Sequence, residues 1–233
     1  METSATKNDD IESIQGDANE LHKVESNYIY NAVSRGLDIV LASVGMILLA
    51  PVFIIVAYKI KKNDGGNIFF KHTRIGKDTE EFKMYKFRTM VPNAEEKLQE
   101  VLENDEELRK EFYENFKLKD DPRITEIGDF LRKTSLDELP QLINIIKGDM
   151  SLVGPRPVVD DELEMHYKGT GDIVFSVKPG LTGMWQVNGR SDVEDYEERI
   201  ALDLKYVKER SLLLDMKIIL KTIKSVIKRE GAY

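Results

Sequence analysis

The longest apolar segment of the chain runs from Ile39 to Tyr58, without a charged side chain. At about 1.5 Å per residue, a helix of that length just crosses a hydrocarbon core roughly 30 Å thick. Length alone therefore favours an ordinary membrane span. Pro51, however, lies inside the run and removes one helical N–H, which favours a break in the helix at that point.

Basic residues flank the apolar run at both ends: Arg35, Lys59, Lys61 and Lys62. Lysine and arginine next to a membrane segment stay preferentially on the cytoplasmic side, so this pattern keeps both ends on one face. A helix that is broken at Pro51 and enters and leaves by the same face satisfies both observations. The residues leave a full span and a re-entrant helix open as alternatives for residues 28–62.

Beyond that segment, the pattern predicts a domain over residues 63–233. Asn67–Ile75 and Phe82–Met90 are rich in β-branched and aromatic residues and are expected to be strands. Apolar residues at helical spacing, together with capping residues, predict the helices. These run from Asn93 to about Phe116 and over Leu139–Lys147, Val158–Lys168, Val193–Arg210 and Leu212–Arg229. Ser151–Pro157 and Lys178–Arg190 are Gly/Pro-rich and are expected to be loops. The predicted fold class is α/β and helix-rich.

The last predicted helix carries apolar and basic residues at interleaved helical spacing. The basic residues are Lys217, Lys221, Lys224 and Lys228. Basic amphipathic helices favour anionic membrane surfaces. The alternative is a peripheral helix that packs on the core and turns its lysines to solvent.

The composition of the chain indicates an acidic N-terminal arm and excludes several kinds of functional site. Residues 1–27 hold seven acidic residues against Lys7 and Lys23, and no aromatic residue, so we expect a disordered acidic arm. The net charge of −8 argues against a nucleic-acid binder. No cysteine occurs, which excludes disulfides, cysteine zinc sites and a thiol nucleophile.

The strongest candidate for chemistry is the pair Asp137-Glu138, because the sequence has neither a P-loop nor a dinucleotide-binding motif. The pair lies where a helix should begin, since Pro140 fits only a first helical turn. Helix-end N–H groups favour an ionised carboxylate, and a carboxylate can attack phosphorus to give an acyl phosphate. Glu138, with water and substrate phosphates, would suit Mg²⁺. The alternative is structural, because Ser135 and Glu138 match a capping box.

Four basic residues could contact phosphate groups. Lys86 and Arg88 lie two apart on a predicted strand and should share one face. Arg156 lies between two prolines, and Arg190 follows the Asn188-Gly189 turn signal. Arginine can hold a phosphate with its planar fork. The alternative for each is an ordinary surface charge.

Three segments resemble the bacterial sugar transferase family, the monotopic phosphoglycosyl transferases. They are FKMYKFRTM, DDPRITEIGDFLRKTSLDELPQLINIIKGDMSLVGPRP and KPGLTGMWQVNGR. The likeness runs from about Tyr28 to Tyr233 and keeps several long motifs in order. The chain looks like a short form, because the multi-span N-terminal region of longer members does not appear in it.

The resemblance implies a monotopic membrane protein of the bacterial cytoplasmic (inner) membrane, with a compact interfacial catalytic domain on the cytoplasmic face. It implies transfer of a sugar 1-phosphate from a UDP-sugar to undecaprenyl (polyprenyl) phosphate, with release of UMP, in the first step of exopolysaccharide or glycan assembly. Asp137 would be the nucleophile, Glu138 would hold Mg²⁺, and the re-entrant helix would break at Pro51. This chain has Ala50 where family members often have serine, which bears on the geometry of the break.

Two other functions remain open at this level. One is a non-catalytic membrane scaffold, in which the dyad is a helix cap. The other is a Mg²⁺-dependent phosphatase that works through an aspartyl phosphate. The sequence does not identify the sugar, and it leaves open whether the chain forms a homo-oligomer.

Overall fold

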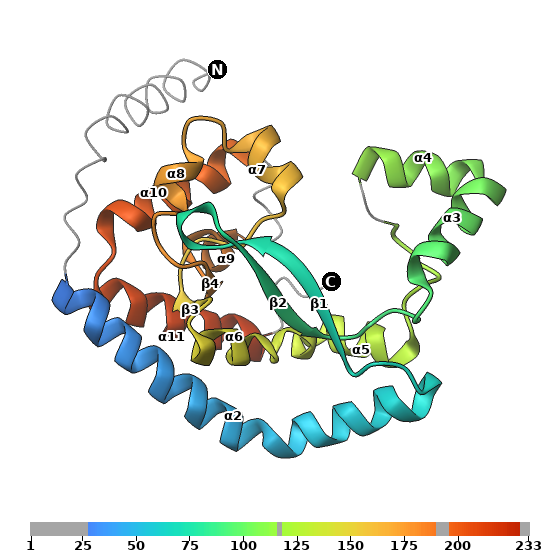
Figure 1. Cartoon of the computed structure of the whole chain (residues 1–233), viewed down its shortest axis with the longest axis horizontal. Coiled ribbons are helices and arrows are strands. Elements are labelled where there is room, and N and C mark those ends of the chain that lie inside the picture. The colour runs from blue at the N-terminus through green and yellow to red at the C-terminus, as the bar shows by residue number, and fades with distance from the viewer. Residues whose placement is uncertain (1–27, 116–117, 190–195, 229–233) are drawn as a thin grey trace. The chain divides into compact units, whose positions relative to one another are not determined.

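The computed structural model describes residues 28–115, 118–189 and 196–228. The predicted acidic arm, residues 1–27, lies outside them, as does Arg190. The helix-rich α/β class predicted from the sequence is confirmed (Figure 1). The elements, in chain order, are α2 (Tyr28–Asp64), β1 (Phe69–Ile75), η1 (Lys77–Thr79), β2 (Glu81–Phe87), α3 (Ala94–Asn104), α4 (Glu106–Asn115), α5 (Glu126–Lys133), η2 (Leu136–Glu138), α6 (Gln141–Lys147), β3 (Ser151–Val153), α7 (Asp160–His166), α8 (Gly171–Val174), β4 (Gly180–Thr182), α9 (Met184–Gly189), α10 (Tyr196–Glu209) and α11 (Leu212–Lys228).

Helix α2 contains the apolar run and is long and apolar enough to cross a membrane. Only 11% of its most apolar 18-residue window is buried, whereas the core helix of a soluble protein would be mostly buried. Ile47, Leu48 and Ile54 are each at least 70% exposed. An exposed apolar surface of this kind is typical of a membrane contact. The helix assignment continues through Pro51, so the predicted re-entrant break stays a prediction.

Two predicted boundaries are wrong. The single helix expected from Asn93 to about Phe116 is two helices, because Asp105 is extended and its side chain accepts from the N–H groups of Glu107 and Leu108, both at 3.0 Å. This side-chain cap starts α4. The predicted strand Phe82–Met90 ends at Phe87, so the strand alternation does not reach Arg88.

The two predicted Gly/Pro-rich loops contain regular structure. Strands β3 and β4 pair in parallel, with Ser151 opposite Gly180 and Val153 opposite Thr182. Helix α9 follows β4 inside the second loop. A Cβ atom on Gly180 would lie 2.1 Å from the backbone N of Gly154, so these glycines permit a backbone approach that no side chain allows. Strands of three residues are too short to show an alternation of apolar and polar residues in the sequence. They form because they pair with each other.

The chain divides into two compact units. The described residues of the first are 28–48, 71–84, 141–189 and 196–228. Its core gathers buried side chains of α8, α10 and α11, among them Val174 and Val207 at 0% exposure. Near the start of α2, Arg35 donates to the carbonyl oxygens of Ile145 and Ile146 at 2.5 and 2.8 Å, which caps the C-terminal end of α6.

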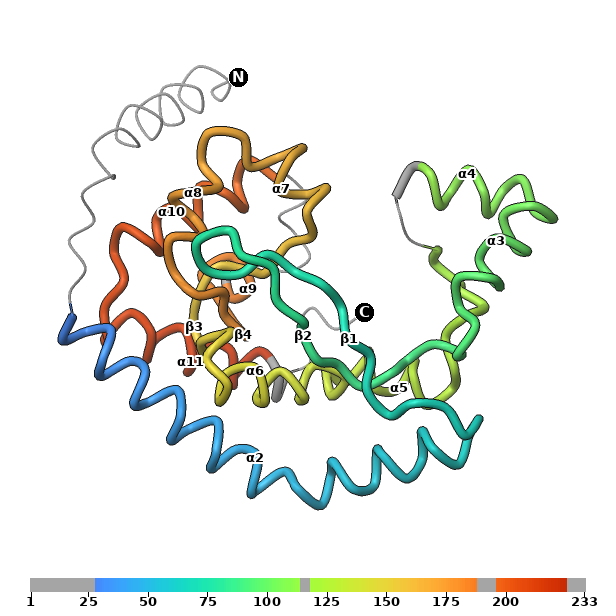
Figure 2. Tube along the Cα trace, viewed as in Figure 1, coloured from blue at the N-terminus to red at the C-terminus, as the bar shows by residue number. Residues whose placement is uncertain are grey.

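The second unit comprises residues 49–70 and 85–140 among those described. Its apolar cluster includes Phe87 and Leu131, with Leu136 and Leu139 packed against it. Helix α5 lies tightly against the end of β2, because a Cβ on Gly128 would come 1.9 Å from the carbonyl oxygen of Thr89. Leu136 and Leu139 flank the dyad and Phe87 follows Lys86, so packing of this cluster brings Lys86 to the dyad. Figure 2 follows the trace of β1 and β2, which pair as a two-stranded sheet.

Candidate active site

The Asp137-Glu138 pair lies in a single 3₁₀ turn, η2, directly before Pro140 and α6. Ser135 precedes the turn in the left-handed region, at φ 54°, which is uncommon and unfavourable for a non-glycine residue. The Ser135 side chain makes no capping hydrogen bond. The capping-box interpretation of Ser135 and Glu138 is therefore wrong. An N-cap residue is typically extended, whereas the backbone of Ser135 is left-handed.

Lys86, from β2, lies between the two carboxylates of the dyad. Its Nζ donates to Glu138 Oε1 at 2.9 Å and is 3.6 Å from Asp137 Oδ2. The side chains of Asp137, Glu138 and Lys86 are 13%, 24% and 24% exposed, so the three charged groups are largely shielded from water. Coulombic attraction is stronger under such shielding than on an open surface.

Burial raises the pKa of Asp137 above its ordinary value, while the charge of Lys86 opposes the rise and that of Glu138 adds to it. The sequence pattern predicts the opposite, a carboxylate made more acidic by helix-end N–H groups. That expectation is wrong because a one-turn 3₁₀ segment offers little helix dipole, and loss of hydration outweighs it. The cation at the dyad, Lys86, favours the carboxylate form of Asp137.

Arg132, in the last turn of α5, is a neighbour of Asp137 that the sequence analysis missed. Its charge lowers the pKa of Asp137, and its Nε donates to Thr89 Oγ1 at 3.0 Å. The residue as a whole is exposed. Its place five residues before the nucleophile candidate, in the same predicted motif, is the signal that could have identified it.

Arg88 takes a different partner from Lys86. Its guanidinium forms an ion pair with Asp64, with one contact from Nη1 to Oδ2 at 2.9 Å, and its Nε donates to the carbonyl oxygen of Asn67 at 2.6 Å. The Arg88 hydrogen bond lowers the pKa of Asp64. These contacts stabilise the turn between α2 and β1. Phosphate binding by Arg88 stays a prediction.

Arg156 belongs to the other compact unit, where it is exposed and lies 5.7 Å from the ring centroid of Trp185. This geometry is a cation–π contact at the long end of the usual range. Arg190 lies outside the described residues. The structure therefore brings together Asp137, Glu138 and Lys86, and adds Arg132.

The described residues contain no group of three or more His, Asp or Glu side chains that could hold a metal by themselves. The donor type at the dyad nevertheless suits Mg²⁺, which prefers oxygen ligands and usually keeps several waters and substrate phosphates. Lys86 competes for Glu138, since its ammonium bonds the same carboxylate. Glu138 thus fits the role of a single protein ligand in a site that substrate would complete.

Comparison with known proteins finds one family and several similar relatives. The family described as bacterial sugar transferase matches residues 29–229. The chain is 50% identical over 216 residues to the UDP-galactose-lipid carrier transferase of Erwinia amylovora and 49% identical over 215 residues to the undecaprenyl-phosphate galactose phosphotransferase of Salmonella typhimurium. These alignments cover 93% and 92% of this chain but 44% of each relative. The exopolysaccharide production protein ExoY of Sinorhizobium fredii is 48% identical over 199 residues, which cover 85% of this chain and 87% of that relative. The chain spans less than half the length of the first two.

Proposed function

Because the chain belongs to the bacterial sugar transferase family, we propose that it transfers a sugar 1-phosphate from a UDP-sugar to undecaprenyl phosphate. The products are a polyprenyl diphosphosugar and UMP. The observation that carries the proposal is the largely buried Asp137-Glu138 pair with Lys86 between its carboxylates. The names of the relatives support a lipid phosphate acceptor and place galactose first among sugars to test.

In the first step, a carboxylate oxygen of Asp137 attacks the phosphorus next to the sugar. A phosphorus–oxygen bond forms to Asp137, the bond to the UMP phosphate breaks, and UMP leaves with that electron pair. In the second step, an oxygen of the lipid phosphate attacks the same phosphorus. The bond to Asp137 breaks, and the carboxylate is restored for another cycle.

Charged groups around Asp137 serve this reaction by lowering the repulsion between a carboxylate and a phosphate. Lys86 holds the dyad oxygens in place and favours the ionised form of Asp137. Arg132 adds positive charge from the side of α5. Glu138 is the residue that would hold Mg²⁺, which when bound neutralises phosphate charge. Preorganised charge in a poorly hydrated site is the largest source of catalysis in many enzymes.

The location proposed for this reaction is the cytoplasmic face of the bacterial inner membrane. The exposed apolar surface of α2 supports membrane attachment, and the basic residues at both ends support the cytoplasmic side. An interfacial site suits two substrates of which one is soluble and the other confined to the bilayer.

Single-turnover chemistry tests the proposal. Enzyme given Mg²⁺ and a panel of UDP-sugars, without lipid, should release a burst of at most about one UMP per active site with the correct sugar. Mass spectrometry of the quenched protein should find a sugar phosphate on the peptide that contains Asp137. Asp137→Asn should abolish both signals. The matched control is Asp129→Asn on α5, whose carboxylate forms an exposed ion pair with Lys133 and should be dispensable.

The alternatives give different products in the same assay. An aspartyl-phosphate phosphatase would release inorganic phosphate, and a membrane scaffold would release neither product. Turnover of Asp137→Asn at near the wild-type rate would show that Asp137 is not the nucleophile.

A further inference from the structure

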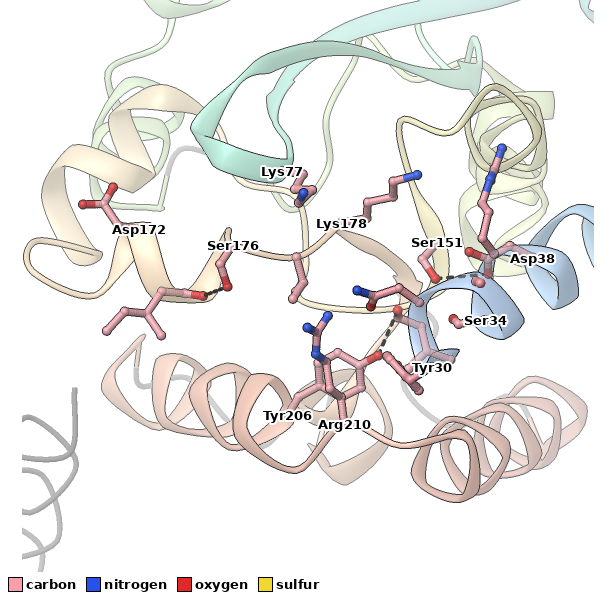
Figure 3. A pocket seen from close by; sticks show the side chains of 16 residues that line it. Tyr30, Ser34, Asp38, Lys77, Ser151, Asp172, Ser176, Lys178, Tyr206 and Arg210 are labelled. Carbon is pink, nitrogen blue, oxygen red and sulfur yellow. Dashed lines mark hydrogen bonds between the residues drawn. The ribbon is translucent and has the colours of Figure 1, made fainter. Parts of the chain in front are cut away.

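A pocket of about 650 Å³ opens in the first compact unit, within the usual size of small-molecule sites. It is lined by the first turns of α2, by η1 and β3, and by residues of α8 and α10 (Figure 3). Neither dyad residue lines it, and Lys86, Arg88 and Arg156 do not line it either. The proposed reaction therefore leaves this pocket without a role.

Positive charge dominates the pocket lining. Four basic residues stand against two carboxylates: Arg35, Lys77, Lys178 and Arg210 against Asp38 and Asp172. The basic residues come from four separate segments of the chain. Figure 3 shows that Lys77 and Arg210 approach the pocket from opposite sides. Side chains that converge in this way from separate segments can surround a ligand.

Most of this charge is not neutralised by the protein itself. Within the described part of the chain, Arg35, Lys178 and Arg210 have no carboxylate at ion-pair distance. Asp38 accepts instead from neutral donors, the N–H of Leu152 at 2.9 Å and Ser151 Oγ at 3.1 Å. An anion in the pocket would therefore meet cations that lack an ionic partner.

Two of the cations are also crowded together. A Cβ atom on Gly148 would lie 3.3 Å from Arg35 Nη2 and 3.5 Å from Lys178 Nζ, so both charges reach the same glycine. Burial lowers the pKa of Lys178, and the charge of Arg35 lowers it further. The two like charges therefore repel one another, and a bound anion would relieve that repulsion. Lys and Arg side chains hold phosphate groups through charge-assisted hydrogen bonds, which are shorter and stronger than those between neutral groups.

The surroundings of the pocket favour a ligand with an apolar tail. Asp38, which lines the pocket, is followed immediately by Ile39, Val40 and Leu41, which are 41%, 57% and 41% exposed. Exposed apolar side chains of α2 thus begin directly after the last α2 residue that lines the pocket. A soluble phosphate ester would use only the cavity, whereas a membrane phospholipid would use both.

We propose that this pocket binds the phosphodiester headgroup of an anionic membrane phospholipid, with the acyl chains along the apolar face of α2. The lipid would fix the depth of the start of α2 in the interface. The inference rests on membrane attachment through α2, which is part of the proposed function, but not on the sugar-phosphate transfer. It is tested without sugar substrate, so its failure would leave the role of Asp137 untouched.

The test measures binding of one phosphatidylglycerol molecule to the full chain in non-ionic detergent, by native mass spectrometry. The variant is Lys77→Gln/Lys178→Gln, which removes two pocket charges. A basic residue near anionic lipid contributes roughly fivefold to affinity, so the double variant should bind at least about tenfold more weakly, and Lys178→Gln alone about fivefold more weakly. The control is Lys168→Gln/Lys205→Gln, which changes the net charge equally at two exposed lysines of the same unit.

Two further ligands separate the sources of the phosphate group. Zwitterionic phosphatidylcholine with the same acyl chains should bind the wild-type chain much more weakly than phosphatidylglycerol. Soluble glycerophosphoglycerol carries the same phosphodiester without acyl chains and should also bind weakly. Equal binding of glycerophosphoglycerol and phosphatidylglycerol would overturn the lipid assignment. Equal loss of phosphatidylglycerol binding in the pocket variant and the control would overturn the pocket itself. So would no loss in either.

Discussion

At the scale of single residues, the Asp137–Lys86 contact affects whether Asp137, the proposed nucleophile, is ionised. Burial raises the pKa of Asp137, and Lys86 opposes this rise. As pH falls through that raised pKa, the carboxylate takes up a proton and can no longer attack phosphorus. The reaction should therefore lose activity on the acidic side at a higher pH than an ordinary aspartate would cause.

Lys86→Gln should move this loss of activity, the acidic limb of the pH–rate profile, to still higher pH. The substitution removes the charge that favours ionised Asp137. The measurement is the rate of the UMP burst as a function of pH. Lys133→Gln, which removes an exposed lysine of α5 paired with Asp129, should leave the limb in place. A limb that stays fixed or moves to lower pH in Lys86→Gln would mean that Lys86 does not control the ionisation of Asp137.

Arg88 shows how sequence spacing can mislead at this scale. Two residues two apart share a face only while the strand continues, and β2 ends at Phe87. Lys86 therefore contacts the dyad, whereas Arg88 pairs with Asp64 near the end of α2. The distinction depends on where the strand ends, which the β-branched and aromatic pattern does not fix.

At the scale of elements, α11 combines the features that a membrane-surface helix needs. Leu213, Met216, Leu220 and Ile223 form an exposed apolar stripe at helical spacing and are 68%, 44%, 60% and 51% exposed. Lys217, Lys221 and Lys224 are exposed beside them. Asp215 and Ile218 are buried, so α11 also packs on the core. The structure therefore shows that the helix packs on the core, and membrane binding by its exposed apolar and basic residues stays a prediction.

Replacing Lys217, Lys221 and Lys224 together with Gln should reduce sugar-phosphate transfer in anionic liposomes by about tenfold, because each lysine near an anionic surface adds to binding. The same variant should lose less than about twofold in neutral detergent. Transfer assays in both media make the comparison. The control replaces three exposed lysines elsewhere, Lys119, Lys168 and Lys205. An equal loss in the two media would assign the α11 lysines a role unrelated to lipid.

At the scale of the whole molecule, membrane topology separates the re-entrant helix from a full span. The chain has no cysteine, so single cysteines at Asn31 and Asn63 can be labelled without background. In intact cells, both should be protected from an impermeant thiol reagent, because the basic residues near both ends of the apolar run keep them on the cytoplasmic side. Labelling at position 31 with protection at position 63 would show a full span. Labelling of both after permeabilisation is the control for reactivity.

The sequence by itself determined the features that short-range patterns encode. The charge-free run Ile39–Tyr58 required an apolar surface on α2, and the spacing of apolar and basic residues predicted α11. The Asp137-Glu138 pair and its motif indicated the family, which the match over residues 29–229 confirms. These features depend on residues within a few turns of one another, so their physical consequences can be read along the chain.

Tertiary structure decided which charges meet and how water reaches them. Lys86 and Glu138 are 52 positions apart, and only packing around Phe87 and Leu131 brings their side chains to 2.9 Å. The same packing buries Asp137 and reverses the pKa shift that local helix geometry suggested. Strands β3 and β4 likewise exist only as a pair. Desolvation and long-range pairing depend on neighbours from distant segments, and a linear pattern of residue types does not specify those neighbours.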